Sequence, residues 1–141
     1  MNDYMAIEEL AATIRRHRAI MLQGFGISLR QYELINLARR HGGLSLAAAA
    51  VELDCDRPTM TVIARNCVVG GWLDRKPSRL DGRSGVLALT GKGEEILDRI
   101  ESFRASEEGE DPLGVLPVDE RAAFLRMADR VARRARDLWG R

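Results

Sequence analysis

The feature that most constrains the fold of this chain is the stretch of residues 54–92, which combines a helix, a tight glycine stop and a basic hairpin. Asp56 is a favourable N-cap, and Pro58 lies in the first turn, where a missing N–H costs little. Gly70-Gly71 can end the helix with a left-handed cap. These signals predict a helix of about three to four turns between Asp56 and the glycine pair.

A hairpin is predicted directly after this helix, with strands at 72–76 and 86–89 and a loop at 77–85 that carries two arginines. Upstream, Ser45 can cap a short Ala-rich helix over 46–53, which leaves three residues before the next helix. That spacing is typical of a helix-turn-helix, and a following hairpin makes it a winged helix-turn-helix.

The helix after Asp56 is predicted to have one buried and one outward face. At 3.6 residues per turn, the buried stripe is Met60, Ile63, Ala64 and Cys67. The outward face holds hydroxyls, an amide and an arginine in place of a Glu/Lys mixture, and such groups suit base edges and phosphates. The alternative is an ordinary exposed surface. The outward residues are Pro58, Thr59, Thr61, Val62, Arg65, Asn66 and Val69.

The net charge of +1 over 141 residues hides a segregation of charge along the chain. Residues 57–92 carry seven Lys/Arg against two Asp/Glu, whereas residues 93–120 carry two against ten. The basic block therefore coincides with the predicted helix and hairpin, as expected of a protein that binds nucleic acid through these elements.

In this order, the segments resemble the MarR family of bacterial winged-helix transcription regulators, over about residues 5–138. The resemblance implies a mostly α fold with a small two- or three-stranded β wing and with N- and C-terminal dimerisation helices. It also implies a homodimer that places the recognition helix in the major groove of DNA and the wing at the minor groove. The matching segments are I-S-L-R-Q-Y-E-L-I at 27–35, L-S-L-A-A-A-A-V-E-L-D-C at 44–55, R-P-T-M-T at 57–61, G-W-L-D-R at 71–75, D-G-R at 81–83 and L-T-G-K-G at 89–93.

The chain departs from the family pattern on the recognition helix. The family usually has a polar or basic residue directly after the threonine and charged residues before the final glycine, where this chain has Val62, Val68, Val69 and Gly70. Val62 can pack on a thymine methyl group, while Arg65 supplies positive charge one turn later.

Three regions of one intertwined domain are expected: an N-terminal dimerisation helix over 1–26, the winged helix-turn-helix over 27–103, and an acidic linker with a C-terminal dimerisation helix over 104–141. The last helix has a long apolar stripe. A single small domain has few other elements that could cover this stripe, so we expect it to be buried against a second copy of the chain. That stripe is Phe124, Leu125, Ala128, Val131, Ala132, Ala135, Leu138 and Trp139.

The function predicted from these observations is sequence-specific regulation of transcription, as a homodimeric repressor on a pseudo-palindromic operator. Base edges or adjacent phosphates are expected to contact Thr59, Thr61, Val62, Arg65 and Asn66. At the wing, the resemblance implies that Asp81 orients Arg83 toward the DNA, with Arg79 beside them. Arg57 and Ser45, near helix starts, are expected at phosphates.

A small aromatic or anionic effector is implied by the resemblance, because the family commonly binds one between the DNA-binding lobe and the dimer helices. Here Arg16, His17, Tyr32 and Arg39 are expected to line such a space.

Two alternatives remain open: a protein-interaction module that docks through Val62, Val68 and Val69, and a redox-responsive regulator that uses Cys55. No cofactor or metal is expected, because Cys55, Cys67, His17 and His41 do not have the spacing of a ligand set. Catalytic motifs are also missing, so the chain is not expected to be an enzyme. Without a long apolar run or a signal-peptide pattern, the expected location is the cytoplasm, with no membrane partner.

Overall fold

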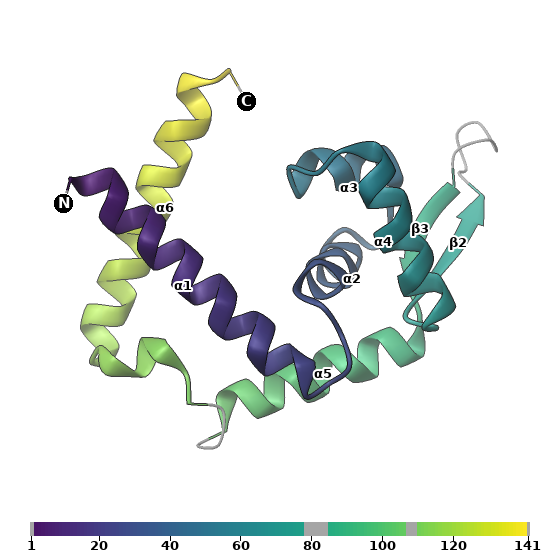
Figure 1. Cartoon of the computed structure of the whole chain (residues 1–141), viewed down its shortest axis with the longest axis horizontal. Coiled ribbons are helices and arrows are strands. Elements are labelled where there is room, and N and C mark those ends of the chain that lie inside the picture. Colours follow the sequence, from purple (N-terminus) through teal and green to yellow (C-terminus); the bar gives the residue numbers. More distant parts are fainter. Residues whose placement is uncertain (1, 78–84, 107–109, 141) are drawn as a thin grey trace. The chain divides into compact units, whose positions relative to one another are not determined.

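The computed structural model describes residues 2–77, 85–106 and 110–140 (Figure 1). The chain divides into two compact units, Met1–Phe103 and Arg104–Arg141. The first unit holds α1 (Asp3–Gln23), α2 (Leu29–His41), β1 (Leu44–Ser45), α3 (Leu46–Glu52), α4 (Arg57–Val69), β2 (Leu73–Pro77), β3 (Gly85–Leu89) and most of α5 (Gly91–Ala105). The second unit holds the 3-10 turn η2 (Pro112–Val115) and α6 (Val118–Leu138).

Local caps set the limits of the three central helices. Ser28 and Gln31 form a capping box at the start of α2, and the left-handed Gly42, with φ of 66°, ends it. The Ser45 hydroxyl accepts the Ala48 N–H at 3.1 Å and begins α3. Asp56 begins α4, as predicted. At the far end of α4, Gly70 keeps right-handed helical geometry and Gly71, with φ of 83°, is the left-handed residue.

The small sheet is antiparallel, with the strand order β1, β3, β2. Its limits correct the predicted loop at 77–85, because Pro77 and Gly85 pair with each other as strand residues. Pro77 is tolerated because β2 is an edge strand and the missing N–H breaks no central ladder. Gly85 fits because a Cβ there would lie 2.8 Å from the Arg75 Cγ atom. The predicted strand start at residue 72 also shifts by one residue, to Leu73.

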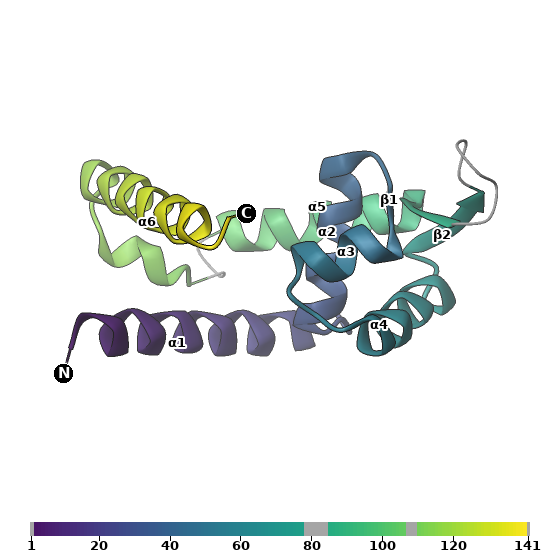
Figure 2. The same ribbon diagram turned by 90° about the horizontal axis from the view of Figure 1, so that it is seen from above.

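The core of the first unit joins α2, α4, the sheet and α5. The predicted buried stripe of α4 is confirmed at Met60, Ala64 and Cys67, all fully buried, while Ile63 is half-buried. Figures 1 and 2 both show α3, α4 and the sheet at the same end of this unit, away from the N-terminus of α1. The other fully buried large side chains are Leu22, Leu34, Ile35, Leu73, Leu87, Leu97 and Ile100.

The long helices α1 and α6 leave apolar side chains exposed. Along α1 only Leu22 is buried, and residues 2–13 are all exposed. Along α6 no residue is fully buried, although its apolar residues keep helical spacing. Among the described residues, no helix is long and apolar enough to cross a membrane.

The segment before α6 is more ordered than the linker predicted there. The Asp111 carboxylate accepts the Leu113 N–H at 3.0 Å and pairs with Arg121 at 2.8 Å, so η2 is tied to α6. The Leu113 N–H, followed by Arg121, holds the pKa of Asp111 below its usual value. Residues 107–109 lie outside the described part of the chain.

Candidate nucleic-acid interface

The outward face of α4 is exposed and contains no acidic side chain. Arg57, Pro58, Thr59, Val62, Arg65, Asn66 and Val69 are exposed along this helix, while the opposite side packs on α2 and α3. Val62 is 50% exposed and Val69 81% exposed. The geometry therefore presents the predicted set of residues on one surface, with Thr61 half-buried at its edge.

The first turn of α4 is organised by Asp56. One carboxylate oxygen of Asp56 accepts the Thr59 N–H and the other accepts the Thr59 hydroxyl, both at 2.8 Å. The Thr59 N–H contributes most to holding the pKa of Asp56 below its usual value, followed by the Thr59 hydroxyl. The Thr61 hydroxyl donates to the Arg57 carbonyl at 2.8 Å.

These bonds change what the two predicted threonines can offer to DNA. Their protons are already donated within the helix, so their oxygens face a partner as acceptors. Arg65 and Asn66 are the exposed side chains of α4's second half that can donate to guanine or adenine edges or to phosphates. The threonine roles stay predictions, restricted to accepting hydrogen bonds in this geometry.

The end of α4 is clamped by the segment that begins α5. The Lys92 ammonium donates to the Gly70 carbonyl at 2.8 Å, and the Thr90 hydroxyl donates to the Gly71 carbonyl at 2.6 Å. A cation at a helix C-terminus also suits the helix dipole. Gly93 is required nearby, since a Cβ there would collide with the Trp72 carbonyl oxygen.

Sequence reasoning missed this role of Lys92. Its charge was counted with the basic block expected at DNA, whereas the structure turns it toward the recognition helix. The L-T-G-K-G segment was a signal that these residues matter, but its spacing alone does not say which carbonyl they contact.

The remaining predicted DNA contacts are Ser45 before α3, Arg57 at the start of α4, and three residues between β2 and β3 in the sequence. Ser45 caps α3 and pairs with Val86 of β3, so its hydroxyl oxygen is already an acceptor. Arg57 is exposed at the first position of α4. On the wing, Arg75 and Lys76 of β2 are exposed. The predicted wing contacts Arg79, Asp81 and Arg83 lie outside the described residues.

The four predicted effector residues are not joined by contacts with one another. Arg39 pairs with Asp98 of α5 at 3.0 Å. The guanidinium carbon of Arg18 lies over the ring of Tyr32, 5.3 Å from the ring centre. Arg16 is exposed and His17 half-buried on α1. Within the described part of the chain, no hydrogen bond, ion pair or ring contact links any two of Arg16, His17, Tyr32 and Arg39.

The two cysteines have different surroundings. Cys67 is fully buried in the core, and burial raises the pKa of its thiol to about 12. Cys55 is half-buried in the turn before α4. Across residues 2–77, 85–106 and 110–140, no group of three or more His, Cys, Asp or Glu side chains is placed to hold a metal ion.

Comparisons with known proteins agree with this architecture. A family model described as "MarR family" matches residues 25–84. No curated protein sequence matches the chain.

Solved structures share the fold at low sequence identity. Wild-type apo MarR from E. coli is 19% identical, with a TM-score of 0.81 over 93% of this chain and 97% of that one. CouR, described as a transcriptional repressor bound to a 23-mer DNA duplex, is 22% identical, with a TM-score of 0.82 over 93% of this chain and 92% of that one. A MarR transcriptional regulator from Methanosarcina mazei Go1 is 20% identical, with a TM-score of 0.81 over 95% and 96%.

Proposed function

We propose that this chain, whose residues 25–84 match the MarR family model, is a MarR-family regulator of transcription that binds double-stranded DNA sequence-specifically. The observation that carries the proposal is the outward face of α4, which combines Arg57, Arg65 and Asn66 with two threonine oxygens and no carboxylate. A DNA duplex presents phosphates and base-edge acceptors to such a face.

The proposed reading unit is a homodimer that acts as a repressor. A dimer places two copies of α4 in successive major grooves, so the operator is a pseudo-palindrome with half-sites about one helical turn apart. CouR, a repressor of the same fold, is bound to a 23-mer DNA duplex, which supports a DNA duplex as the partner. A small aromatic or anionic effector is proposed to alter DNA affinity, with Arg16, His17, Tyr32 and Arg39 near its site.

No catalytic role is part of the proposal. The proposed partners are the operator duplex, a second copy of the chain and the effector. Arg75 and Lys76 were not among the DNA contacts predicted from the sequence. Both are exposed on β2, and they are proposed as phosphate contacts.

The test is DNA selection followed by salt-dependent binding. The purified protein should enrich a two-fold-related sequence from a random duplex pool and bind it about a thousandfold more tightly than random DNA, with a steep salt slope. Arg65→Ala should weaken operator binding and relax the preference at one position in each half-site. Arg75→Ala is the matched control, because it should weaken operator and random DNA equally. A pool that yields no enriched sequence at low salt would remove this proposal.

The second candidate, a protein-docking surface, is favoured by one observation. Val62 and Val69 are exposed and Val68 is half-buried on the same helix. The same selection discriminates the two, since a protein-docking module has no reason to enrich a DNA sequence.

A further inference from the structure

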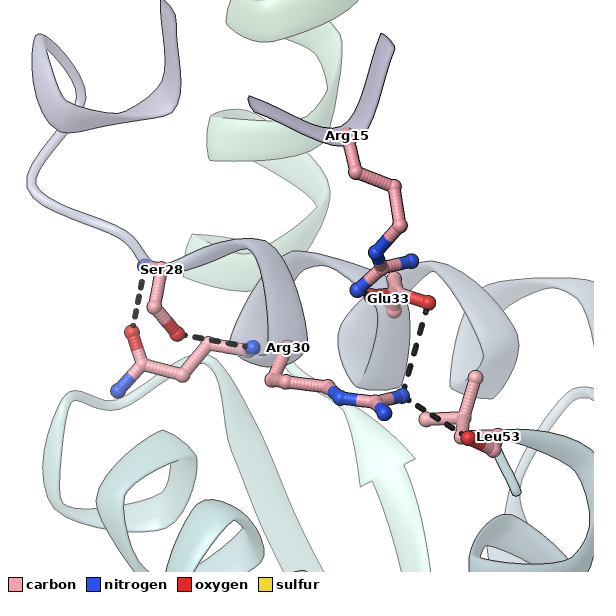
Figure 3. A network of polar contacts seen from close by, with 6 residues as sticks. Arg15, Ser28, Arg30, Glu33 and Leu53 are labelled. Carbon is pink, nitrogen blue, oxygen red and sulfur yellow. Dashed lines mark hydrogen bonds and ion pairs between the residues drawn. The ribbon is translucent and has the colours of Figure 1, made fainter. Parts of the chain in front are cut away.

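A chain of polar contacts joins α1 to the turn that precedes the recognition helix (Figure 3). The Arg15 guanidinium of α1 donates to the Glu33 carboxylate of α2 at 3.0 Å. The other Glu33 oxygen lies 3.9 Å from the guanidinium of Arg30. Arg30 in turn donates to the main-chain carbonyl of Leu53 at 2.9 Å. Three helices are thus connected through two arginines that share one carboxylate.

The Leu53 carbonyl lies where the chain leaves α3 and turns toward α4. Leu53 is the C-cap of α3, and the next residue, Asp54, has a left-handed φ of 48°. Residues other than glycine adopt such a conformation only where their surroundings hold it. The Leu53 carbonyl belongs to the peptide that leads into Asp54, so the Arg30 bond fixes the orientation of that peptide.

The turn continues from this point into the N-cap of α4. The Cys55 N–H donates back to the Ala50 carbonyl at 2.9 Å, and Asp56 then caps α4. Only Asp54 and Cys55 separate the residue that Arg30 holds from that N-cap. The Arg30 contact therefore ties α2 to the turn from which the recognition helix begins.

We propose that Arg30 is a positioning residue for DNA reading, and that Glu33 links it to α1 through Arg15. This inference rests on the proposed DNA-binding function. Glu33 is more buried than either arginine, so its carboxylate gains from both partners and restricts where each guanidinium lies. A shift of α1 that removes Arg15 from Glu33 releases the carboxylate, so that Glu33 no longer holds Arg30 at the Leu53 carbonyl and the turn loosens.

Because Glu33 is negatively charged, replacing it distinguishes a positioning role from a general effect of charge on DNA affinity. Glu33→Gln removes one negative charge, so electrostatics alone predicts tighter binding of every duplex. A positioning role predicts weaker binding of the operator by Glu33→Gln. We expect Glu33→Gln to weaken binding of a duplex selected by the wild-type protein by about three- to tenfold, the net scale of one ordinary hydrogen bond. Binding of a random duplex should stay equal or tighten slightly.

The arginine variants have matched controls on the same helices. Arg30→Ala should lose more operator affinity than random-duplex affinity, whereas Arg40→Ala, at the exposed end of α2, should lower both equally. Arg30→Lys can still donate to the Leu53 carbonyl and should recover part of the loss. Arg15→Ala should weaken operator binding more than Arg16→Ala does, and should add little in the Glu33→Gln background.

A measurement without DNA tests the same contact. Hydrogen exchange of the Cys55 amide should be faster in Arg30→Ala than in the wild type or in Arg40→Ala, because the turn opens more often. Tighter operator binding by Glu33→Gln, or unchanged Cys55 exchange in Arg30→Ala, would overturn the inference. Failure of the wild-type protein to select any duplex would instead count against the proposed function, and the exchange result would still decide on the contact.

Discussion

Val62 brings a branched apolar side chain into the polar outward face of α4. It is half exposed, with Arg65 and Asn66 on the following turn and Pro58 on the preceding one. Both neighbouring threonine protons are donated within the helix, so hydrogen bonding by those hydroxyls is limited to accepting. An apolar group at this place discriminates bases best through the C5 methyl of thymine, which lies in the major groove.

We predict that Val62 contacts one thymine methyl group in each half-site. Replacing that thymine by deoxyuridine removes only the methyl, and the wild-type protein should lose about fourfold in affinity per half-site, from roughly 0.8 kcal/mol per buried carbon. Val62→Ala should bind the thymine and deoxyuridine operators equally, while Val62→Thr should keep part of the difference. Anisotropy titrations with duplexes substituted one position at a time give the measurement. Equal sensitivity of wild type and Val62→Ala at every position would contradict the contact.

At this scale the sequence predicts which residues face outward, but not what they are bonded to. The stripe of Met60, Ala64 and Cys67 follows from helical periodicity alone, so its burial could be predicted. The bond from Lys92 to Gly70 and that from Arg30 to Leu53 join residues 22 and 23 positions apart. Such contacts depend on how the elements pack, and no local pattern encodes them.

Among the elements, α4 had the most predictable limits because both of its end signals are local. Asp56 caps one end, and Gly71 takes the left-handed conformation beyond the other. The sheet was predicted less well. Pro77 and Gly85 were assigned to the loop because of their turn propensities, whereas pairing between β2 and β3 extends to both residues. Pairing partners distant in sequence thus overrode local propensity.

The N-cap of α4 predicts an acid-dependent loosening of the recognition helix. The N-cap residue is Asp56, and the folded-state pKa of its carboxyl is lowered, first by the Thr59 N–H and then by the Thr59 hydroxyl. The stabilisation is therefore present above the unfolded-state pKa, near about 4, and is lost as the pH falls through the lower folded-state value. Between about pH 6 and pH 3, the wild type should lose more thermal stability than Asp56→Asn, whose amide oxygen still accepts the Thr59 N–H at any pH.

Asp74→Asn is the control for that experiment, because it removes an exposed aspartate from β2 without touching a cap. Its melting temperature should fall with pH as the wild type's does. Parallel pH profiles for wild type and Asp56→Asn would show that the carboxylate adds nothing beyond what the amide supplies.

For the whole molecule, the open question is what covers the long apolar faces. Along α6 and its C-cap, Leu125 is 47%, Val131 60% and Trp139 73% exposed, and the N-terminal half of α1 is exposed throughout. Contiguous apolar surface of this kind is uncommon on a monomer that stays in solution. The resemblance to the MarR family implied a dimer from the sequence, and the exposed faces agree with the need for one. The sequence of one chain cannot give the pairing geometry, because the partner surface belongs to another copy.

We predict that the protein is a homodimer whose interface includes the apolar face of α6. Light scattering after size exclusion should give twice the chain mass of 15.7 kDa for the wild type. Val131→Glu places a charge on the apolar face, where burial against a second copy would leave it unpaired, and it should shift the protein toward the monomer. Arg126→Glu puts the same side chain on the polar face and should remain dimeric. Because two recognition helices are needed to hold both half-sites, Val131→Glu should also lose operator affinity at nanomolar protein and recover part of it as the protein concentration rises. A Val131→Glu protein that stays dimeric would place the interface elsewhere.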